Sequence, residues 1–369
     1  MMIQDVQEKA FNIFLKIFLI GSMVFFVPNQ QAYIPQELFI SFSAMIFLAF
    51  SFFVRPRREI SNFSAGLLLM YLIAVTLFIS LTNEGKSSLL NAFFGFVIFK
   101  VVAERVDVQD VVKFGRLFML FCVANIVLLS LQVLNRDPIF SSMNPQNMPE
   151  IDKVGFMGVR FALGCIGALM TPFIYAVSPI WCIAVVPLLI FGKSSTAIAA
   201  AVISFMFLLW FDHRRAFWIL LALMVPCVIA YPFMCGHLTM SSRRFGVWLA
   251  GISLTRIKPW FGQGLGAWNL MNFTTIQANG EPQKWIWAHN EFVQLLFEAG
   301  IAGLICLYAF LKRAFSRLSL YFESNRIAFA ALISLLIVSF FHFPFHIGRL
   351  AGMGLFILSF VEATNGERA

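Results

Sequence analysis

The chain has 369 residues, of which 60% are hydrophobic and only 12% are charged, and its mean hydropathy is +0.83. Such an apolar fraction exceeds what the core of a soluble protein of this length can bury, so the composition excludes that class and indicates an integral membrane protein with many spans. The formal net charge of +9 reflects basic loops on one side of the membrane, and we therefore expect no nucleic-acid partner.

Apolar runs suited to crossing a bilayer occur along the whole chain. They predict an all-α, polytopic membrane protein of about 12 transmembrane helices, with residues 1–369 forming a single integral membrane domain. The predicted spans are residues 10–27, 36–54, 63–81, 87–103, 111–134, 156–177, 179–192, 194–211, 216–234, 291–311, 327–343 and 347–362.

Lys and Arg residues gather in the short loops that follow even-numbered spans, whereas the intervening loops are nearly free of them. Basic loops resist translocation, so these loops are predicted to be cytoplasmic, and both termini with them. The clusters are Arg55, Arg57 and Arg58; Arg105, Lys113 and Arg116; Arg214 and Arg215; and Lys312, Arg313, Arg317 and Arg326.

Two predicted outer loops hold nearly all the polar chemistry: a large one at residues 235–290 and a smaller one at residues 135–155. Positive charge is normally sparse on this side, yet the large loop is basic, which favours an anionic ligand. Its charged residues are Arg243, Arg244, Arg256, Lys258 and Lys284 against Glu281. The smaller loop leads to Arg160, which either snorkels to lipid headgroups or forms a second phosphate contact.

An amphipathic helix is predicted within the large loop, from Arg243 to about Ile257, lying at the membrane surface. Its apolar stripe consists of Phe245, Trp248, Leu249 and Ile252, with Arg244 at the border. Three glycines follow at positions 262, 264 and 266. Gly264 and Gly266 either allow the backbone to approach a ligand or form a plain turn.

His289 is the strongest catalytic candidate, because it directly precedes an apolar helix and imidazole can accept a proton near neutral pH. A lone histidine at such a position is more often a cap or a buried hydrogen-bonding group. Asn290 and Glu291 follow at the helix start. Glu298 lies about two and a half turns further on, on a different face, so it is expected to orient or pack rather than share the His289 proton.

A second pair of histidines, His342 and His346, has the spacing of a metal site on a helix, but Pro344 separates them and no carboxylate accompanies them. A structural or substrate-cavity role is favoured, with Arg349 beyond the pair. The outer loops contain no Asp-x-Asp pair that would hold a metal–diphosphate. We therefore predict no metal and no cofactor, with arginine as the counter-charge.

Three motifs in this order resemble the bacterial O-antigen ligase and O-antigen polymerase family. They are Arg244-Phe-Gly-Val-Trp248, then Pro259-Trp-Phe-Gly262-Gln-Gly264-Leu-Gly266, and then His289-Asn290-Glu-Phe-Val-Gln294-Leu-Leu-Phe-Glu298-Ala-Gly300-Ile-Ala-Gly303. The resemblance covers residues 194–303, with a looser match at residues 155–162 and 343–346.

This resemblance implies a glycosyltransferase in the bacterial inner membrane, with its active site on the periplasmic face. Such an enzyme moves a glycan from undecaprenyl diphosphate to a sugar hydroxyl of lipid A core or of another lipid-linked glycan, with inversion. By resemblance, His289 is the general base and Arg244 holds the leaving diphosphate. The implied substrate-binding residues are Arg160, Lys193, Arg243, Gly264, Gly266, Asn290, Glu298 and Arg349. Ser195 stands where the family often has arginine, and Lys193 or Arg160 would replace that cation.

A transporter or flippase for a lipid-linked oligosaccharide is the alternative. Transporters tend to place charged groups near mid-membrane and to show related halves. Here the distinctive polar residues gather in the outer loops, which favours the transferase. The sequence does not decide between ligase and polymerase.

Overall fold

The structure, a computed structural model, describes residues 2–24, 34–58, 63–79, 82–139, 154–223, 242–276, 282–320 and 322–364. Most of the predicted smaller outer loop, the start of the large loop and the second half of the predicted span 216–234 lie outside the described residues.

Each predicted apolar run coincides with helical structure over most of its described length. The long helices are α1 (Met2–Val24), α2 (Ile34–Phe53), α3 (Phe63–Ile79), α4 (Asn83–Arg105), α5 (Val111–Val133), α6 (Arg160–Val177), α8 (Ser195–Asp212), α12 (Glu291–Leu320), α13 (Phe322–Phe341) and α14 (Gly348–Thr364). Predicted span 179–192 is a 3-10 segment, η3 (Pro179–Val185), continued by α7 (Val186–Gly192). Residues 214–223 are also helical.

Six of the described helices are long and apolar enough to cross a membrane: α4, α5, α6, α8, α12 and α13. Shorter apolar helices cover residues 38–53, 64–77 and 179–192. The structure thus confirms an all-α protein with candidate membrane spans, while the total of about 12 stays a prediction. Large apolar side chains on these helices are exposed, including Phe52 at 78% and Leu120 at 65%, as lipid contact requires.

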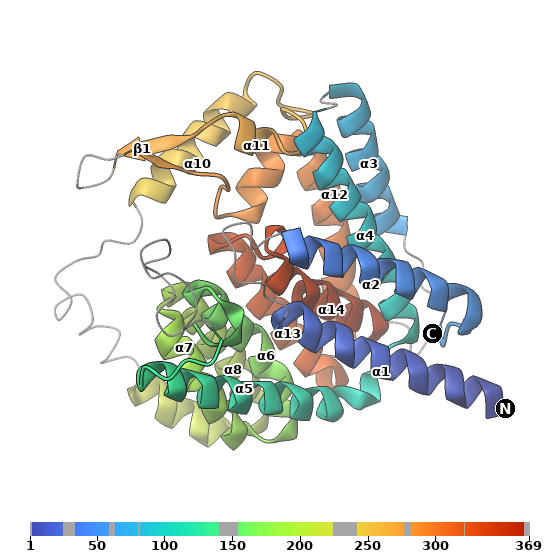
Figure 1. Cartoon of the computed structure of the whole chain (residues 1–369), viewed down its shortest axis with the longest axis vertical. Helices are drawn as coiled ribbons and strands as arrows, with labels where there is room; N and C mark the ends of the chain where they lie inside the picture. The colour runs from blue at the N-terminus through green and yellow to red at the C-terminus, as the bar shows by residue number, and fades with distance from the viewer. Residues whose placement is uncertain are drawn as a thin grey trace.

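Helix α14 runs through the centre of the molecule, between the N-terminal helices and α5–α8 (Figure 1). It packs against α1, α4, α6 and α13, and nearly all of its side chains are buried. Phenylalanine rings fill the contact with α6, where Phe173 lies 5.5 Å from Phe356 and 5.3 Å from Phe360 between ring centroids. The centre of the bundle is therefore built by aromatic packing between distant parts of the chain.

Basic residues join several helix ends at one end of the bundle, called here the basic end. Arg57, after α2, pairs with Glu8 in α1 at 2.8 Å and with Asp107 after α4 at 2.5 Å. Arg58 donates to the Ala363 carbonyl near the end of α14. The beginning of α1 and the end of α14 consequently lie together. Further pairs at helix ends are Arg313 with Glu362 and Arg326 with Asp212.

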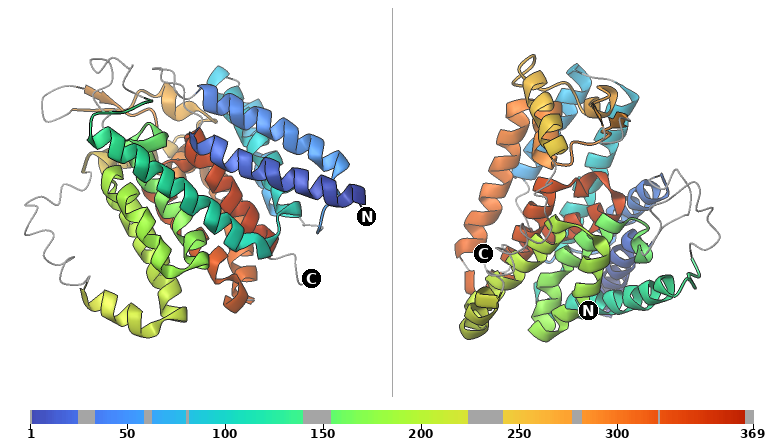
Figure 2. Two further views of the ribbon diagram at one scale, coloured as in Figure 1. Left: turned by 60° about the horizontal axis from the view of Figure 1, so that its bottom comes forward. Right: turned by 90° about the vertical axis from the view of Figure 1, so that its left-hand side faces the viewer.

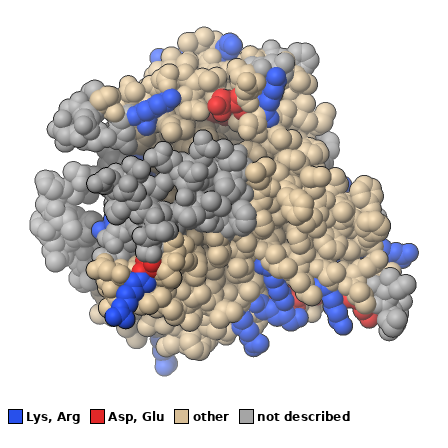
Figure 3. All heavy atoms as spheres, viewed as in Figure 1, with Lys and Arg blue, Asp and Glu red and all other residues tan. Residues whose placement is uncertain are grey.

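The elements of the large loop lie at another end of the molecule, beside α3 and the first part of α12 (Figures 1 and 2). They are α10 (Ser242–Thr255), α11 (Ala267–Leu270) and an antiparallel hairpin of β1 (Thr274–Ile276) and β2 (Pro282–Lys284). The sequence prediction did not include this hairpin. On the face in Figure 3, Lys and Arg gather mainly toward the upper and lower ends, with a broad surface of other residues between them.

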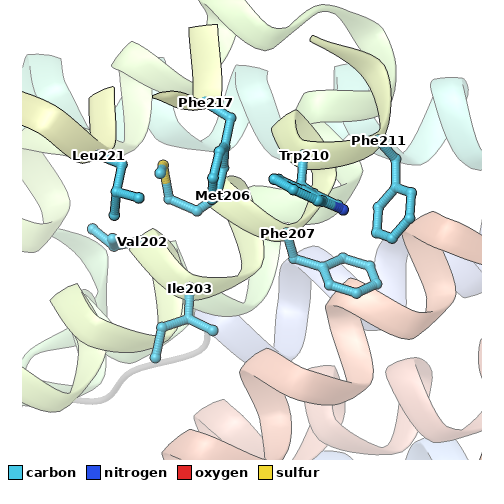
Figure 4. Close-up of a pocket in the computed structure, with 8 residues that line it drawn as sticks. All are labelled: Val202, Ile203, Met206, Phe207, Trp210, Phe211, Phe217 and Leu221. Atoms are coloured by element: carbon cyan, nitrogen blue, oxygen red, sulfur yellow. The ribbon is translucent and has the colours of Figure 1, made fainter. Parts of the chain in front are cut away.

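An apolar groove of about 490 Å³ lies along the second half of α8 and the helical residues 214–223 (Figure 4). Its lining contains no charged side chain and consists of Val202, Ile203, Met206, Phe207, Trp210, Phe211, Phe217 and Leu221. The groove extends along α8 toward Asp212, which pairs with Arg326 at the basic end of the molecule. It offers an apolar surface without groups for catalysis.

Helix α12 is interrupted at Gly300, where the backbone adopts φ +68° and ψ −168°. The loop from Pro259 to Gly264 docks against this break with its own backbone. Gln263 and Gly264 donate their N–H groups to the carbonyls of residues 297 and 298 at 2.8 and 2.9 Å, and the N–H of Ile301 donates to Pro259 at 2.9 Å. The peptide groups freed by the break are thus hydrogen-bonded to the loop, as buried backbone groups require.

We expect Gly300→Ala to lower the free energy of unfolding by roughly 2 kcal/mol or more, because left-handed backbone is costly for alanine. Its Cβ would also lie only 2.4 Å from the Trp260 carbonyl oxygen. Thermal unfolding of the purified protein in detergent measures the loss. Gly66→Ala in α3 is the matched control, since an added Cβ there has open space and alanine favours helix. Equal melting temperatures for the two variants would contradict the docking role of Gly300.

Candidate active site

His289 occupies a strained position immediately before α12. Its backbone has φ +54°, a left-handed conformation in which histidine and asparagine are enriched among non-glycine residues. Asn290 caps the helix, since its Oδ1 accepts the N–H groups of Phe292 and Val293 at 2.9 and 3.0 Å. The sequence prediction placed both residues at this helix start, and the cap explains why the chain turns sharply at His289.

The peptide groups of Ala288 are held from two sides, which fixes the backbone that carries His289. Its N–H donates to Gln294 Oε1 of α12 at 3.2 Å. Its carbonyl accepts the indole N–H of Trp248 in α10 at 2.6 Å. Because Ala288 is buried and both contacts come from helices, the position of the imidazole is set by α10 and α12 together.

The imidazole of His289 lies among aromatic rings. The centroid of its ring lies 4.4 Å from that of Phe343, 5.2 Å from that of Trp285 and 6.5 Å from that of His342. Its Nδ1 is buried without a hydrogen-bond partner among the described residues. Burial, the charge of Arg244 and then His342 lower the pKa of His289 to about 3, so the ring is neutral at physiological pH and able to accept a proton.

Arg244 projects from the buried face of α10, one turn before Trp248. One guanidinium nitrogen donates to the carbonyl of Phe341, the last residue of α13, at 2.9 Å. Burial lowers the pKa of Arg244 without neutralising it, and its charge acts on both His289 and His342. In the described part of the chain no Asp or Glu forms an ion pair with it. This half-buried cation is thus close enough to His289 and His342 for its charge to lower the pKa of both imidazoles.

One detail of the predicted amphipathic helix is wrong. Trp248 does not share the outer stripe, because it is only 6% exposed and bonds to Ala288. The outer stripe consists of Phe245, Leu249 and Ile252, which are 53%, 63% and 40% exposed. Helix α10 therefore presents Arg244 and Trp248 inward and an apolar face outward.

His342 directly follows α13 and completes a cluster of basic side chains. Its Nε2 lies 3.1 Å from Ser194 Oγ, and its ring stacks on Phe161 with a centroid distance of 5.3 Å and an interplanar angle of 9°. Burial and then the charge of Arg244 lower the pKa of His342 to about 3. Its Nδ1 is buried and has no hydrogen-bond partner in the part of the chain that the structure describes.

The predicted cations Arg160 and Lys193 belong to segments that contact His342. Arg160 begins α6 and precedes Phe161, while Lys193 ends α7 with φ +47° and precedes Ser194. The two segments approach closely, since a Cβ on Gly192 would lie 2.6 Å from the Gly164 backbone. The structure thus brings the backbones of both residues beside the site. The side chain of Arg243 lies outside the described part of the structure.

Glu298 belongs to an internal network rather than to the space around His289. Its Oε1 accepts from the Trp268 N–H at 3.4 Å and from Gln294 Nε2 at 3.2 Å. Gln294 Nε2 also lies 3.0 Å from His346 Nε2. The Gln294 side chain that holds Ala288 is therefore held in turn by Glu298.

Glu291 anchors the other end of this network. Its carboxylate lies 3.0 Å from His346 Nδ1 and accepts the Phe345 N–H at 2.8 Å. Burial alone would lower the pKa of His346, but the carboxylates of Glu291 and Glu298 outweigh it and raise that pKa. The pair predicted from the spacing of His342 and His346 is thus divided, with His342 beside His289 and His346 in the supporting network.

Three further predicted substrate-binding residues contact the protein itself. The N–H of Gly264 donates to the Glu298 carbonyl at 2.9 Å. Gly266, with φ +73°, leaves no room for a Cβ, which would lie 2.8 Å from the Glu84 backbone. Arg349 is 2% exposed and donates to the Met157 carbonyl. These glycines serve close packing between elements.

Sequence reasoning missed the partners that build the site around the two leading candidates. Ser194, Trp248 and Gln294 contribute polar groups to the described structure near His289 and His342. Gln294 and Trp248 lie within the motifs given above. Each stands four residues from a predicted site residue, Glu298 and Arg244 respectively, and this helical spacing could have indicated that they lie on the same helix face as the site.

The fold and the site together define a polytopic helical membrane protein with a histidine–arginine centre outside its candidate spans. Residues 180–308 match the O-antigen ligase family, a segment that includes α8, α10, the docking loop and His289. The match covers about a third of the chain and is a similarity to that family, in line with the resemblance of the motifs, and it supports an O-antigen ligase-like function in general. A search of curated proteins found no match to the chain.

Proposed function

We propose that this protein transfers a glycan from undecaprenyl diphosphate to a sugar hydroxyl, as an O-antigen ligase or polymerase. The observation that carries the proposal is the pairing of His289, a half-buried imidazole whose lowered pKa keeps it neutral, with the half-buried cation Arg244, which has no carboxylate partner among the described residues. Glycosyl transfer to a hydroxyl needs a base for the nucleophile and a positive charge for the departing phosphate.

In the proposed reaction, the acceptor oxygen attacks the anomeric carbon while its proton passes to the imidazole of His289. The bond between the anomeric carbon and the phosphate oxygen breaks, and the electron pair leaves with undecaprenyl diphosphate. Arg244 stabilises that charge with the N–H groups that Phe341 does not use. A single displacement inverts the anomeric centre, and no metal takes part.

Other predicted residues divide into three groups in this proposal. Arg160 and Lys193 supply the second positive charge near the diphosphate, because their segments contact His342 beside Arg244. Asn290 and Glu298 position His289 through the helix cap and through Gln294. Arg243 completes the proposed substrate-binding set, and Gly264, Gly266 and Arg349 support that set through their contacts within the protein.

We propose a bacterial inner membrane location with the site on the periplasmic side. The basic end joins the beginning of α1 to the end of α14, and basic loops remain in the cytoplasm. The site then opens on the opposite side, where the exposed Phe245, Leu249 and Ile252 of α10 rest in the lipid headgroup zone. Both termini are cytoplasmic in this orientation.

The proposal is tested by comparing glycolipids from a cell that lacks its own ligase and polymerase, with and without this protein. A glycan newly attached to lipid A core identifies a ligase, and a lengthened lipid-linked glycan identifies a polymerase. A flippase would move the donor across the membrane without forming a new glycosidic bond. Absence of any new bond, with the protein correctly inserted and donor present, would reject the transferase.

The pH profiles of kcat/KM and of kcat should differ, because the first reports the pKa of His289 in the free enzyme and the second its pKa in the enzyme–substrate complex. The pKa of His289 is lowered to about 3 in the free protein, so kcat/KM should keep its plateau to below about pH 5. Bound diphosphate raises that pKa, because its negative charge favours the imidazolium. The acid limb of kcat should therefore fall at higher pH than the limb of kcat/KM. A kcat/KM inflection at the ordinary histidine value would contradict this.

A further inference from the structure

We propose that His342 is a further substrate-binding residue, whose Nδ1–H donates a hydrogen bond to an oxygen of the bound diphosphate. The inference rests on the proposed function and adds a neutral donor to the charge of Arg244. Its first support is position, since His342 follows the residue whose carbonyl anchors Arg244, and its ring centroid lies 6.5 Å from that of His289.

The orientation of the ring supplies the second support. Ser194 Oγ caps α8 by accepting the Ala197 N–H at 3.3 Å, and it lies 3.1 Å from His342 Nε2. When the serine hydroxyl donates to Nε2, the ring proton is on Nδ1. Stacking on Phe161 at an interplanar angle of 9° holds the ring in that plane.

The third support is an unmet hydrogen bond. His342 is 4% exposed, and its Nδ1 is buried without a partner in the described structure. Leaving a buried donor unpaired is costly, so such groups are uncommon in folded proteins and each calls for an explanation. A phosphate oxygen is an acceptor that would satisfy it.

The surrounding charge selects an anion as that ligand. Arg244, which is positive, acts electrostatically on both His342 and His289, and no negative group does so among the described residues. A neutral imidazole donor at His342 also fits the roles proposed above, in which His289 takes the proton from the hydroxyl of the acceptor sugar. His342 consequently affects how tightly the diphosphate is held and does not serve as the base.

Two substitutions at His342 separate its ring nitrogens. Asparagine places its amide at the Nδ1 position, whereas glutamine reaches the Nε2 position. With undecaprenyl diphosphate as the probe, we expect His342→Gln to weaken binding to purified protein about 10-fold or more. His342→Asn should stay within about 3-fold of the original affinity. The matched control is His213→Gln, at an exposed histidine after α8.

The serine provides a milder second test if the glutamine variant does not fold. Ser194→Ala should weaken probe binding, because it frees the imidazole to turn, and Ser194→Thr should restore it. Unchanged affinity in His342→Gln, or equal losses in His342→Gln and His342→Asn, would overturn the inference. If the original protein binds no undecaprenyl diphosphate, the proposed function itself fails.

Discussion

His289→Asn is expected to reduce glycan transfer by about 10³-fold or more, because it removes the base that deprotonates the acceptor hydroxyl. Asparagine is the sharper choice, since the backbone at this position has φ +54° and asparagine tolerates left-handed backbone better than alanine does. Folding and donor binding should therefore be retained. Turnover is measured on purified protein with a lipid-linked donor and a defined acceptor.

The control for this experiment is His213→Asn, which changes an exposed histidine after α8 and should leave turnover unchanged. His289→Ala should lose both turnover and some stability, since the left-handed conformation costs alanine about 1–2 kcal/mol. If His289→Asn retains turnover within about 10-fold of the original, the acceptor proton goes elsewhere, and His289 is a buried hydrogen-bonding group.

Most helices of this fold could be predicted from the sequence, because a long apolar run in a membrane protein must bond its backbone internally. Local composition does not reveal features that depend on distant partners. The break at Gly300 exists because the backbone of residues 259–264 replaces helical hydrogen bonds, and nothing near Gly300 signals that docking. The same holds for Gly264, whose N–H donates to the carbonyl of Glu298, a residue far from it in the sequence.

The candidate site was predictable in its two leading residues and not in its full set. His289 and Arg244 lie in ordered motifs, and the structure places both near His342. His342 itself was paired by spacing with His346, yet the turn at Pro344–His346 sends the two rings to different partners. Sequence spacing is reliable along one continuous helix and loses meaning where the helix ends.

Arg244→Lys is expected to reduce kcat/KM by about 100-fold, chiefly through weaker holding of the diphosphate. The guanidinium carries five N–H groups. One of its nitrogens donates to the Phe341 carbonyl at 2.9 Å, and the N–H groups of the other nitrogens remain for phosphate oxygens. A lysine has a single nitrogen, which cannot serve the carbonyl and the diphosphate with the same geometry. Kinetics and donor binding on purified protein measure the loss. Arg256→Lys, at an exposed arginine just after α10, is the matched control.

The contact with Phe341 raises a competing explanation, in which Arg244 only caps the end of α13. That role predicts a lower melting temperature and normal donor affinity for Arg244→Lys. The proposed role predicts the opposite pattern, a weakened donor complex in a protein that melts nearly as before. Combining Arg244→Lys with His289→Asn adds a further test. Two residues serving one chemical step should lose less together than the sum of their separate losses, whereas a folding defect at Arg244 would add in full.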